Sequence, residues 1–185
     1  MSGRHSSQGG AIPDPAALAT HIPGLRRFAC ALLHGDRERA DDLVQDSLER
    51  ALSGWHRRRV DGDLRGWIYT ILYNQFASDQ RRQRRRALHN SLMEAMTADL
   101  AVIDGGQEQA LEHRDLVRGF ADLPAEQRSV LILIGVEDFS YHEAAGILGV
   151  PIGTVMSRLS RGRERLRQFM NGGLARRRPE LTMAK

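Results

Sequence analysis

The sequence predicts an all-α protein made of two small helical domains joined by a flexible linker. Apolar residues recur at helical spacing over residues 15–86 and again over residues 110–170. No segment alternates apolar and polar residues over the length of a strand. Between the periodic stretches, residues 87–109 carry weakly patterned apolar side chains and an Asp-Gly-Gly sequence at 104–106, which is typical of a linker.

The N-terminal half is expected to hold three helices. Residues 1–14 are rich in Ser, Gly and Pro and predict a disordered tail. One amphipathic helix follows and ends near Gly35, and a second, with apolar residues from Leu43 to Leu52, ends near Gly54. The polar residues 56–63 predict a loop. The third helix begins near Leu64 and ends in the arginine-rich run 81–86.

The C-terminal half is expected to hold four helices and a basic tail over residues 171–185. The first covers residues 111–121, and Pro124 suits the opening turn of the second. Ser140 and Glu143 have capping-box spacing and start a short third helix, which ends at a turn containing Gly149. The fourth helix is expected from Pro151 to about residue 170.

The composition argues against several classes of protein. No apolar run is long enough to span a bilayer and residues 1–14 lack the apolar centre of a signal peptide, so we expect a cytoplasmic protein without membrane insertion. Cys30 is the single cysteine, which excludes an internal disulfide, and its apolar neighbours predict burial. The histidines are scattered, and no phosphate loop or catalytic triad is present. We therefore expect no metal, cofactor, small-molecule substrate or enzymatic activity.

Charge is distributed unevenly along the chain, although the net charge is only +4. Residues 36–49 sum to −4, whereas residues 56–86 sum to +6 and residues 150–170 to +4. Basic segments of this kind favour contact with nucleic acid, and the acidic segment favours a protein partner because it would repel phosphate.

A short capped helix, a glycine turn and a longer basic helix are the parts of a DNA-reading helix-turn-helix. Apolar residues of the short helix can pack on Val155 and Leu159, which leaves the other faces of the long helix accessible. A helical hairpin with a solvated basic face is the alternative, but the cap, the glycine turn and the proline together favour DNA binding. The candidate DNA-contacting residues are Thr154, Met156, Ser157, Arg158, Ser160, Arg161 and Arg163.

Two pairs of segments carry a family resemblance. Residues 123–131 (LPAEQRSVL) and 140–167 (SYHEAAGILGVPIGTVMSRLSRGRERLR) resemble region four of bacterial sigma factors. Residues 40–51 (ADDLVQDSLERA) and 64–82 (LRGWIYTILYNQFASDQRR) resemble region two of the small extracytoplasmic-function group. The resemblance covers roughly residues 16–86 and 110–170, in the family's order.

The resemblance implies a dissociable initiation subunit that binds core RNA polymerase and promoter DNA. Region two, within residues 15–86, would grip the polymerase and capture the melted minus-ten element, and region four, within residues 110–170, would read the minus-thirty-five element. Factors of this group usually act in stress or envelope responses and are held by an anti-sigma protein, around which a flexible linker would let the domains close. The implied polymerase-binding residues are Asp42, Gln45 and Asp46. The implied minus-ten residues are His56, Arg57, Arg58, Arg59, Arg65, Asn74, Arg81 and Arg82.

Several residues depart from the family or allow two interpretations. Met156 stands where the family usually has a basic residue, and Ser160 replaces a bulkier one. Glycines at 146 and 162 are unusual inside helices and cost roughly 1 kcal/mol each relative to alanine, which close packing or approach to DNA would offset. Helical spacing places Trp67 and Phe76 in the core, whereas Trp55 and Tyr73 can either stack on a base or pack.

Two other functions were weighed against this one. A stand-alone helix-turn-helix regulator would bind a palindromic operator without polymerase, but it does not account for the region-two resemblance. An enzyme acting on nucleic acid would need a catalytic constellation that the sequence lacks.

Overall fold

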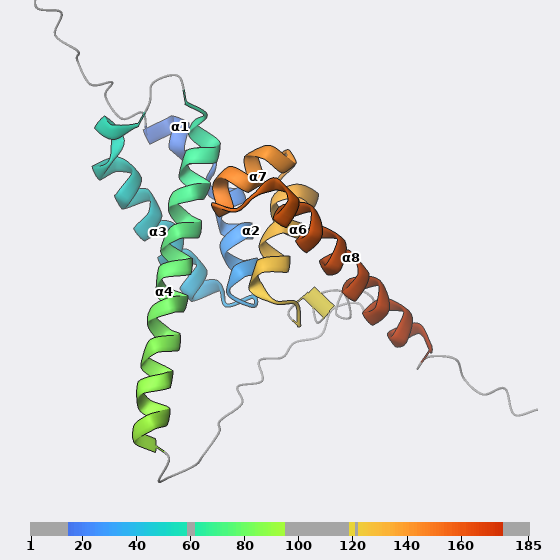
Figure 1. Ribbon diagram of the computed structural model, residues 1–185. Coiled ribbons are helices and arrows are strands. Elements are labelled where there is room, and N and C mark those ends of the chain that lie inside the picture. Colours follow the sequence, from blue (N-terminus) through green and yellow to red (C-terminus); the bar gives the residue numbers. More distant parts are fainter. Residues whose placement is uncertain (1–14, 59–61, 95–118, 121, 176–185) are drawn as a thin grey trace, which may run out of the picture.

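The computed structural model describes residues 15–58, 62–94, 119–120 and 122–175, without the side chains of residues 15, 57, 87–94 and 171–175. Its N-terminal half contains α1 (Pro15–Ala19), α2 (Ile22–Leu32), α3 (Arg37–Ser53), the 3-10 helix η1 (Trp55–Arg57) and α4 (Leu64–Glu94). Its C-terminal half contains α6 (Ala125–Gly135), α7 (Tyr141–Leu148) and α8 (Ile152–Ala175). The described residues are helical or in loops, as Figure 1 shows, which confirms the all-α class.

The helix boundaries differ from the expected ones in four places. The first expected helix is two helices, because Pro23 lies in the first turn of α2 and has no N–H to donate back into α1. The third expected helix, α4, continues through the basic run to Glu94, so residues 87–94 of the expected linker are helical. The last helix begins at Ile152, where the Pro151 carbonyl accepts hydrogen bonds from the N–H groups of the next turn, and it ends at Ala175, so residues 171–175 of the expected tail are helical. The helix expected at 111–121 lies outside the described residues, apart from 119–120 and their helical turn.

The two halves of the chain pack directly against each other and share one hydrophobic core. α2 packs on α6 and α4 packs on α7, so two N-terminal helices have a C-terminal neighbour (Figure 1). The Tyr69 ring of α4 lies 5.5 Å from the ring of Phe28 and 4.9 Å from that of Phe139, centroid to centroid. All three aromatic side chains are buried. The sequence predicted the two helical units but did not reveal this contact between them.

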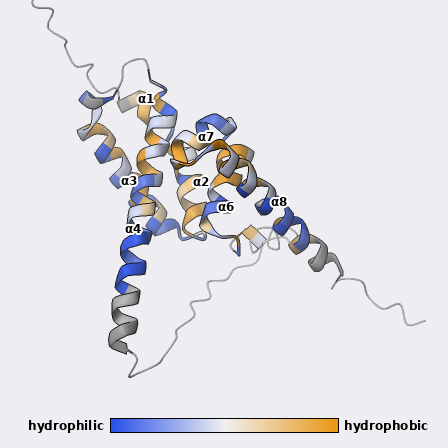
Figure 2. Ribbon diagram, in the orientation of Figure 1, coloured by the Kyte–Doolittle hydropathy of each residue, from blue (hydrophilic) through white to orange (hydrophobic). Residues whose placement is uncertain are grey.

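The ends of α4 and α8 extend away from the shared core in different directions (Figure 1). Figure 2 shows apolar residues facing the centre, where α2, α4 and α6 meet, and hydrophilic residues on the middle of α4 and along α8. Residues 81–86 of α4 are all exposed. Within the described ranges, no helix combines the length and apolar character that a membrane crossing requires.

The two unusual helical glycines have different explanations. Gly162 of α8 is buried against α6, and a Cβ at this position would lie 2.9 Å from Leu131 Cδ1. A Cβ at Gly146 of α7 would meet no atom within 4 Å. Close packing therefore explains Gly162, and nothing in the structure explains Gly146.

Candidate nucleic-acid interface

The short helix α7 begins with a complete capping box. Ser140 Oγ accepts a hydrogen bond from the Glu143 N–H at 3.2 Å, and Glu143 Oε2 accepts one from the Ser140 N–H at 2.7 Å. These hydrogen bonds favour the charged carboxylate and lower the pKa of Glu143. At the other end, Gly149 adopts φ 63°, a left-handed conformation that suits glycine and turns the chain toward α8. The predicted cap and turn are confirmed.

Apolar contacts across this turn hold α7 and α8 together. Ala144, Ile147 and Leu148 of α7 are buried, and so are Val155 and Leu159 of α8. Because Val155 and Leu159 are four residues apart, they lie on one face of α8 and leave the opposite face to solvent. The arrangement is a helix-turn-helix with α8 as its long, accessible helix.

The candidate DNA-contacting residues of α8 fall into two groups according to their exposure. Met156, Ser160, Arg161 and Arg163 are exposed, whereas Thr154, Ser157 and Arg158 are half-buried. Arg161 folds back along the helix, where its Nε donates to the Ser157 carbonyl and its Nη2 to Ser157 Oγ, both at 3.2 Å. Burial raises the pKa of the Tyr73 hydroxyl in the N-terminal half, and the positive charge of Arg158 opposes this effect. Arg161 and Ser157 thus form one polar unit on the exposed side.

The acidic candidates lie together on α3, far along the chain from α8. Asp42, Gln45 and Asp46 are exposed. Asp46 Oδ2 accepts a 2.9 Å hydrogen bond from Nε2 of Gln75, a buried residue of α4, and Gln75 Oε1 accepts one from Ser47 Oγ. Gln75 therefore orients the carboxylate of Asp46. No local sequence signal identified it, because its partner is 29 residues away in the chain.

A hollow of about 260 Å³ lies between α3 and α4, next to this acidic group. Its lining includes Asp42, Asp46 and Asp79 on the acidic side and Arg39 and Arg82 on the basic side. Opposite charges in one groove suit a polar protein partner better than phosphate. Within the described residues, no group of three His, Cys, Asp or Glu side chains is placed to hold a metal ion.

The residues expected to capture the minus-ten element surround the start and outer face of α4. Asp63 caps this helix by accepting from the N–H groups of Arg65 at 3.0 Å and Gly66 at 2.7 Å. Asn74, Arg81 and Arg82 are exposed along α4, and His56 is exposed on η1. The Arg57 side chain and all of Arg59 lie outside the described residues.

The aromatic residues near this face are mostly packed. Trp55 is 7% exposed and meets Trp67 edge-on at 6.0 Å between ring centroids. The Arg58 guanidinium lies over the Trp55 ring at 5.2 Å. Tyr73 is half-buried, with its ring 6.3 Å from that of Phe76. Trp55 is therefore a core residue in this structure, and the predicted burial of Phe76 is confirmed.

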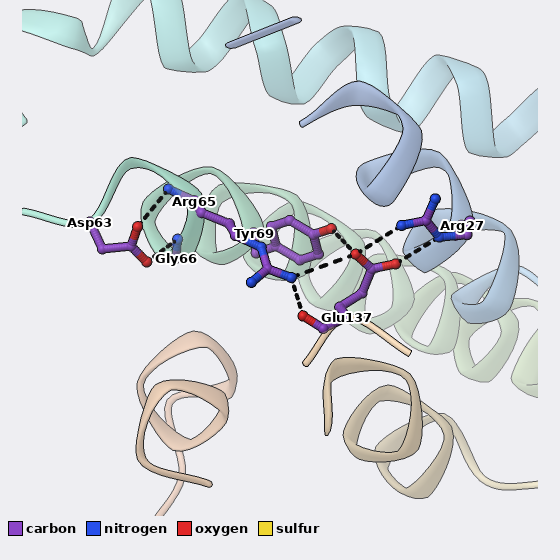
Figure 3. Close-up of polar contacts among 6 residues, drawn as sticks. All are labelled: Arg27, Asp63, Arg65, Gly66, Tyr69 and Glu137. Carbon is purple, nitrogen blue, oxygen red and sulfur yellow. Dashed lines mark hydrogen bonds and ion pairs between the residues drawn. The ribbon is translucent and has the colours of Figure 1, made fainter. Parts of the chain in front are cut away.

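A buried carboxylate joins the two halves of the chain beside this face (Figure 3). Glu137, in the turn between α6 and α7, is 4% exposed and accepts hydrogen bonds from the Tyr69 hydroxyl at 2.7 Å and from Arg27 Nε at 2.9 Å. Arg65 donates to the Glu137 carbonyl, and its guanidinium lies 4.0 Å from the Phe139 ring centroid. Arg65, expected on DNA, is thus engaged by the C-terminal half in this arrangement.

A second polar contact joins the halves at the C-terminal end of α2. Arg128 of α6 is 1% exposed, and its Nη2 donates to the Leu32 carbonyl at 3.1 Å. Both terminal nitrogens of Arg128 lie 2.9 Å from ring nitrogens of His34. His34 and Asp138 adopt positive φ angles of 58° and 51°, so each polar contact adjoins a left-handed residue. Neither contact follows from local motifs in the sequence.

Comparison with known proteins identifies the family of this chain. Residues 18–73 match the model described as the Sigma2 domain of PhyR, and residues 113–166 match sigma-70 region 4. The ECF RNA polymerase sigma factor EcfG of Rhodopseudomonas palustris (strain TIE-1) is 40% identical over 145 residues, which are 78% of each chain. The chain belongs to the extracytoplasmic-function sigma factors.

Other relatives and solved structures agree with this assignment. The sigma factor SigE of Mycolicibacterium smegmatis is 32% identical over 75% of this chain and 54% of its own. The Bartonella quintana sigma factor RpoE, solved in complex with the anti-sigma factor NepR, superposes with a TM-score of 0.68 at 36% identity, over 84% of this chain and 95% of that one. CnrH, solved with the cytosolic domain of CnrY, shares the fold at 24% identity and a TM-score of 0.59.

The family match assigns the polar contact of Figure 3 to two functional regions. Arg27 and Tyr69 lie within the region-two match, and Glu137 lies within the region-four match. The sigma factor therefore connects its region two to its region four through a buried carboxylate.

Proposed function

We propose that this sigma factor binds core RNA polymerase and promoter DNA through three separate surfaces. The acidic face of α3 binds the polymerase, η1 and α4 capture the melted minus-ten element, and α8 reads the minus-thirty-five element as duplex. The observation that carries the proposal is the capped helix-turn-helix, whose accessible helix exposes Arg161 and Arg163 on the side away from the core. In this proposal, the factor acts in the cytoplasm and catalyses no reaction itself.

The charges on these surfaces support the proposal that polymerase and DNA bind at separate surfaces. Asp42 and Gln45 are exposed, and Gln75 holds Asp46 beside them, so α3 presents a negative surface that would repel phosphate. On α4, Arg81 and Arg82 are exposed two turns beyond Asn74. Extracting a base from the stack costs a few kcal/mol, and a cationic surface beside the base helps to offset that cost.

The packing of region two against region four limits the access of DNA to some of the predicted minus-ten residues. Arg65 is engaged by Glu137 and Phe139, and Tyr73 is half-buried near Arg158. We propose that region two and region four separate when the promoter is bound, and that an anti-sigma protein of the kind bound by the B. quintana relative holds them together otherwise. Solution scattering of the chain with and without that partner measures the separation of the two regions and so tests the proposal. The chain alone is expected to be more extended on average than the chain in the complex, because packed and separated arrangements interconvert until the partner holds the packed one, and equal dimensions would refute this.

Open-complex formation is the direct test of the main proposal. Core RNA polymerase is mixed with the full chain, co-purification is measured, and promoter melting is followed by permanganate footprinting. We expect a stoichiometric complex that melts DNA only when the chain is present. A chain that leaves core polymerase unbound and instead binds a palindromic duplex tightly by itself would identify a stand-alone regulator.

A further inference from the structure

Exposed apolar side chains lie on a part of the molecule that is otherwise basic. Among the described residues, the large apolar side chains that remain exposed are Leu52, Val136, Tyr141, Ile152 and Met156. Three of these five belong to the helix-turn-helix, with exposures of 39% for Tyr141, 47% for Ile152 and 52% for Met156. Single exposed apolar residues are ordinary, but three of them on one helix-turn-helix indicate a binding surface.

Two of these side chains line one hollow, and the third shares a helix face with one of them. Ile152 and Met156 are four residues apart on α8 and therefore lie on the same face, in its first two turns. Tyr141, the first residue of α7, lines a hollow of about 350 Å³ together with Met156 and the buried Leu159. Ser160 lines it too. The hollow thus has an apolar side and floor.

Basic side chains outnumber acidic ones around the apolar part of the hollow. Arg163, Arg167 and Glu164 belong to its lining, Glu164 pairs with Arg167, and Arg161 is exposed on the same helix. Residues 150–170 sum to a charge of +4. Apolar atoms inside a cationic rim complement the major groove of DNA, where phosphates flank the edges of the bases.

Only one group in the major groove is apolar. The C5-methyl of thymine distinguishes the T·A pair there, whereas guanine and adenine present hydrogen-bonding atoms that arginine, lysine, asparagine and glutamine recognise. Met156 has no donor to offer guanine, and its flexible thioether adapts to a small apolar group. We infer that Met156, supported by Tyr141 and Ile152, selects a T·A pair in the upstream element by contact with the thymine methyl group.

This inference rests on the proposed function of α8, and it names the base that the helix selects. The test uses holoenzyme assembled from core polymerase and the full chain. DNA with a randomised upstream element is selected for binding, and the best sequence is then resynthesised with each thymine replaced singly by uracil. Uracil lacks only the C5-methyl group, so its hydrogen bonds are unchanged.

We expect one T·A pair to be enriched at a fixed position in the selected element. Replacing its thymine by uracil should weaken binding about four-fold, the size expected for one methyl group removed from an apolar contact. Met156→Ala should bind the thymine and uracil duplexes equally. Met156→Arg should favour a G·C pair at that position, because arginine can donate to guanine.

The control is Leu52→Ala, which removes an apolar side chain of similar exposure (43%) from α3. Holoenzyme that contains the Leu52→Ala variant should lose as much DNA affinity on uracil substitution as holoenzyme that contains the unmodified chain. Uracil substitutions without effect in an element that is nevertheless selected would refute the methyl contact and leave the reading role of α8 intact. Selection without any upstream preference would refute both. Loss of core-polymerase affinity in Met156→Ala would refute the inference in favour of a protein contact.

Discussion

The Tyr69 hydroxyl of region two donates a 2.7 Å hydrogen bond to Glu137 Oε2 of region four, 68 residues further along the chain. Both residues are almost completely buried. A buried carboxylate is stable only when its charge is paired and hydrogen-bonded, and Arg27 provides the paired charge. The contact between the two regions is therefore specific, because sliding one region over the other would leave this charge unpaired.

Removing the Glu137 carboxylate should weaken the contact between the regions. In Glu137→Ala, the buried Tyr69 hydroxyl loses its acceptor, and we expect the free energy of unfolding to fall by about 1–3 kcal/mol. Urea denaturation measures the loss, and an increased radius of gyration in solution scattering would show that the regions separate. Glu164→Ala is the control, since its carboxylate pairs with Arg167 on the surface and should cost less than about 1 kcal/mol. Equal losses in the two variants would contradict a special role for Glu137.

Gly24 gives a steric test of the same contact. A Cβ on Gly24 would overlap the Tyr69 hydroxyl and lie 2.7 Å from Glu137 Oε2. Gly24→Ala should therefore destabilise the protein, although alanine is the better helix former. Gly146→Ala is a matched change in open space and should stabilise by up to about 1 kcal/mol. Thermal unfolding of both variants should show melting temperatures that shift in opposite directions, and two upward shifts would show that the close approach at Gly24 is unimportant.

Alkaline pH should disrupt the contact through Tyr69. Burial and the hydrogen bond to Glu137 raise the pKa of this hydroxyl above the ordinary tyrosine value of about 10. The folded protein thus holds the proton more tightly than the unfolded chain does. The resulting stability is fully present below about pH 10 and is lost as pH rises through the higher pKa of the folded state.

Urea denaturation between about pH 9 and 12 measures this loss, and absorbance at 295 nm follows the ionisation. Tyr69→Phe should show a shallower decline in unfolding free energy over the same range. Burial also raises the pKa of Tyr73, so Tyr73→Phe is the matched comparison for a tyrosine without the Glu137 hydrogen bond. Identical declines in the unmodified chain and Tyr69→Phe would contradict the assignment.

The division between polymerase and DNA surfaces predicts opposite phenotypes for two sets of changes. Arg161→Ala should weaken use of the upstream element and leave the affinity for core polymerase unchanged, because Arg161 lies on the exposed side of α8. Combined Asp42→Ala and Gln45→Ala changes on α3 should do the reverse. Binding to labelled core polymerase and transcription from promoters with and without the upstream element separate the effects. Equal loss of polymerase binding in both variants would show that the surfaces are not separate.

Local signals in the sequence predicted the helix-turn-helix well. The cap of α7 needs only Ser140 and Glu143, three residues apart, and the turn needs only a residue that tolerates a left-handed conformation, Gly149. Hydrogen bonds between near neighbours depend little on the rest of the fold. The cap of α4 is equally local, because Asp63 accepts hydrogen bonds from the N–H groups of Arg65 and Gly66.

The positions of individual site residues required the folded chain. Resemblance predicted Asp42, Gln45 and Asp46 as polymerase-binding residues, and the orientation of Asp46 depends on Gln75 of another helix. Whether Trp55 packs or stacks on a base depended on Trp67, which covers its ring from α4. Neither neighbour follows from helical periodicity, because periodicity gives the buried face of a helix and not the partner that covers it.

The sequence alone determined the all-α class, the cap and turn of the DNA-reading motif, and the family to which the chain belongs. Only the tertiary structure decided that region two and region four share a core, with Glu137 buried between Arg27 and Tyr69. The reason is physical. Helix starts and turns arise from interactions within a few residues, whereas the pairing of a buried charge depends on which distant side chains the packed helices bring within hydrogen-bond distance.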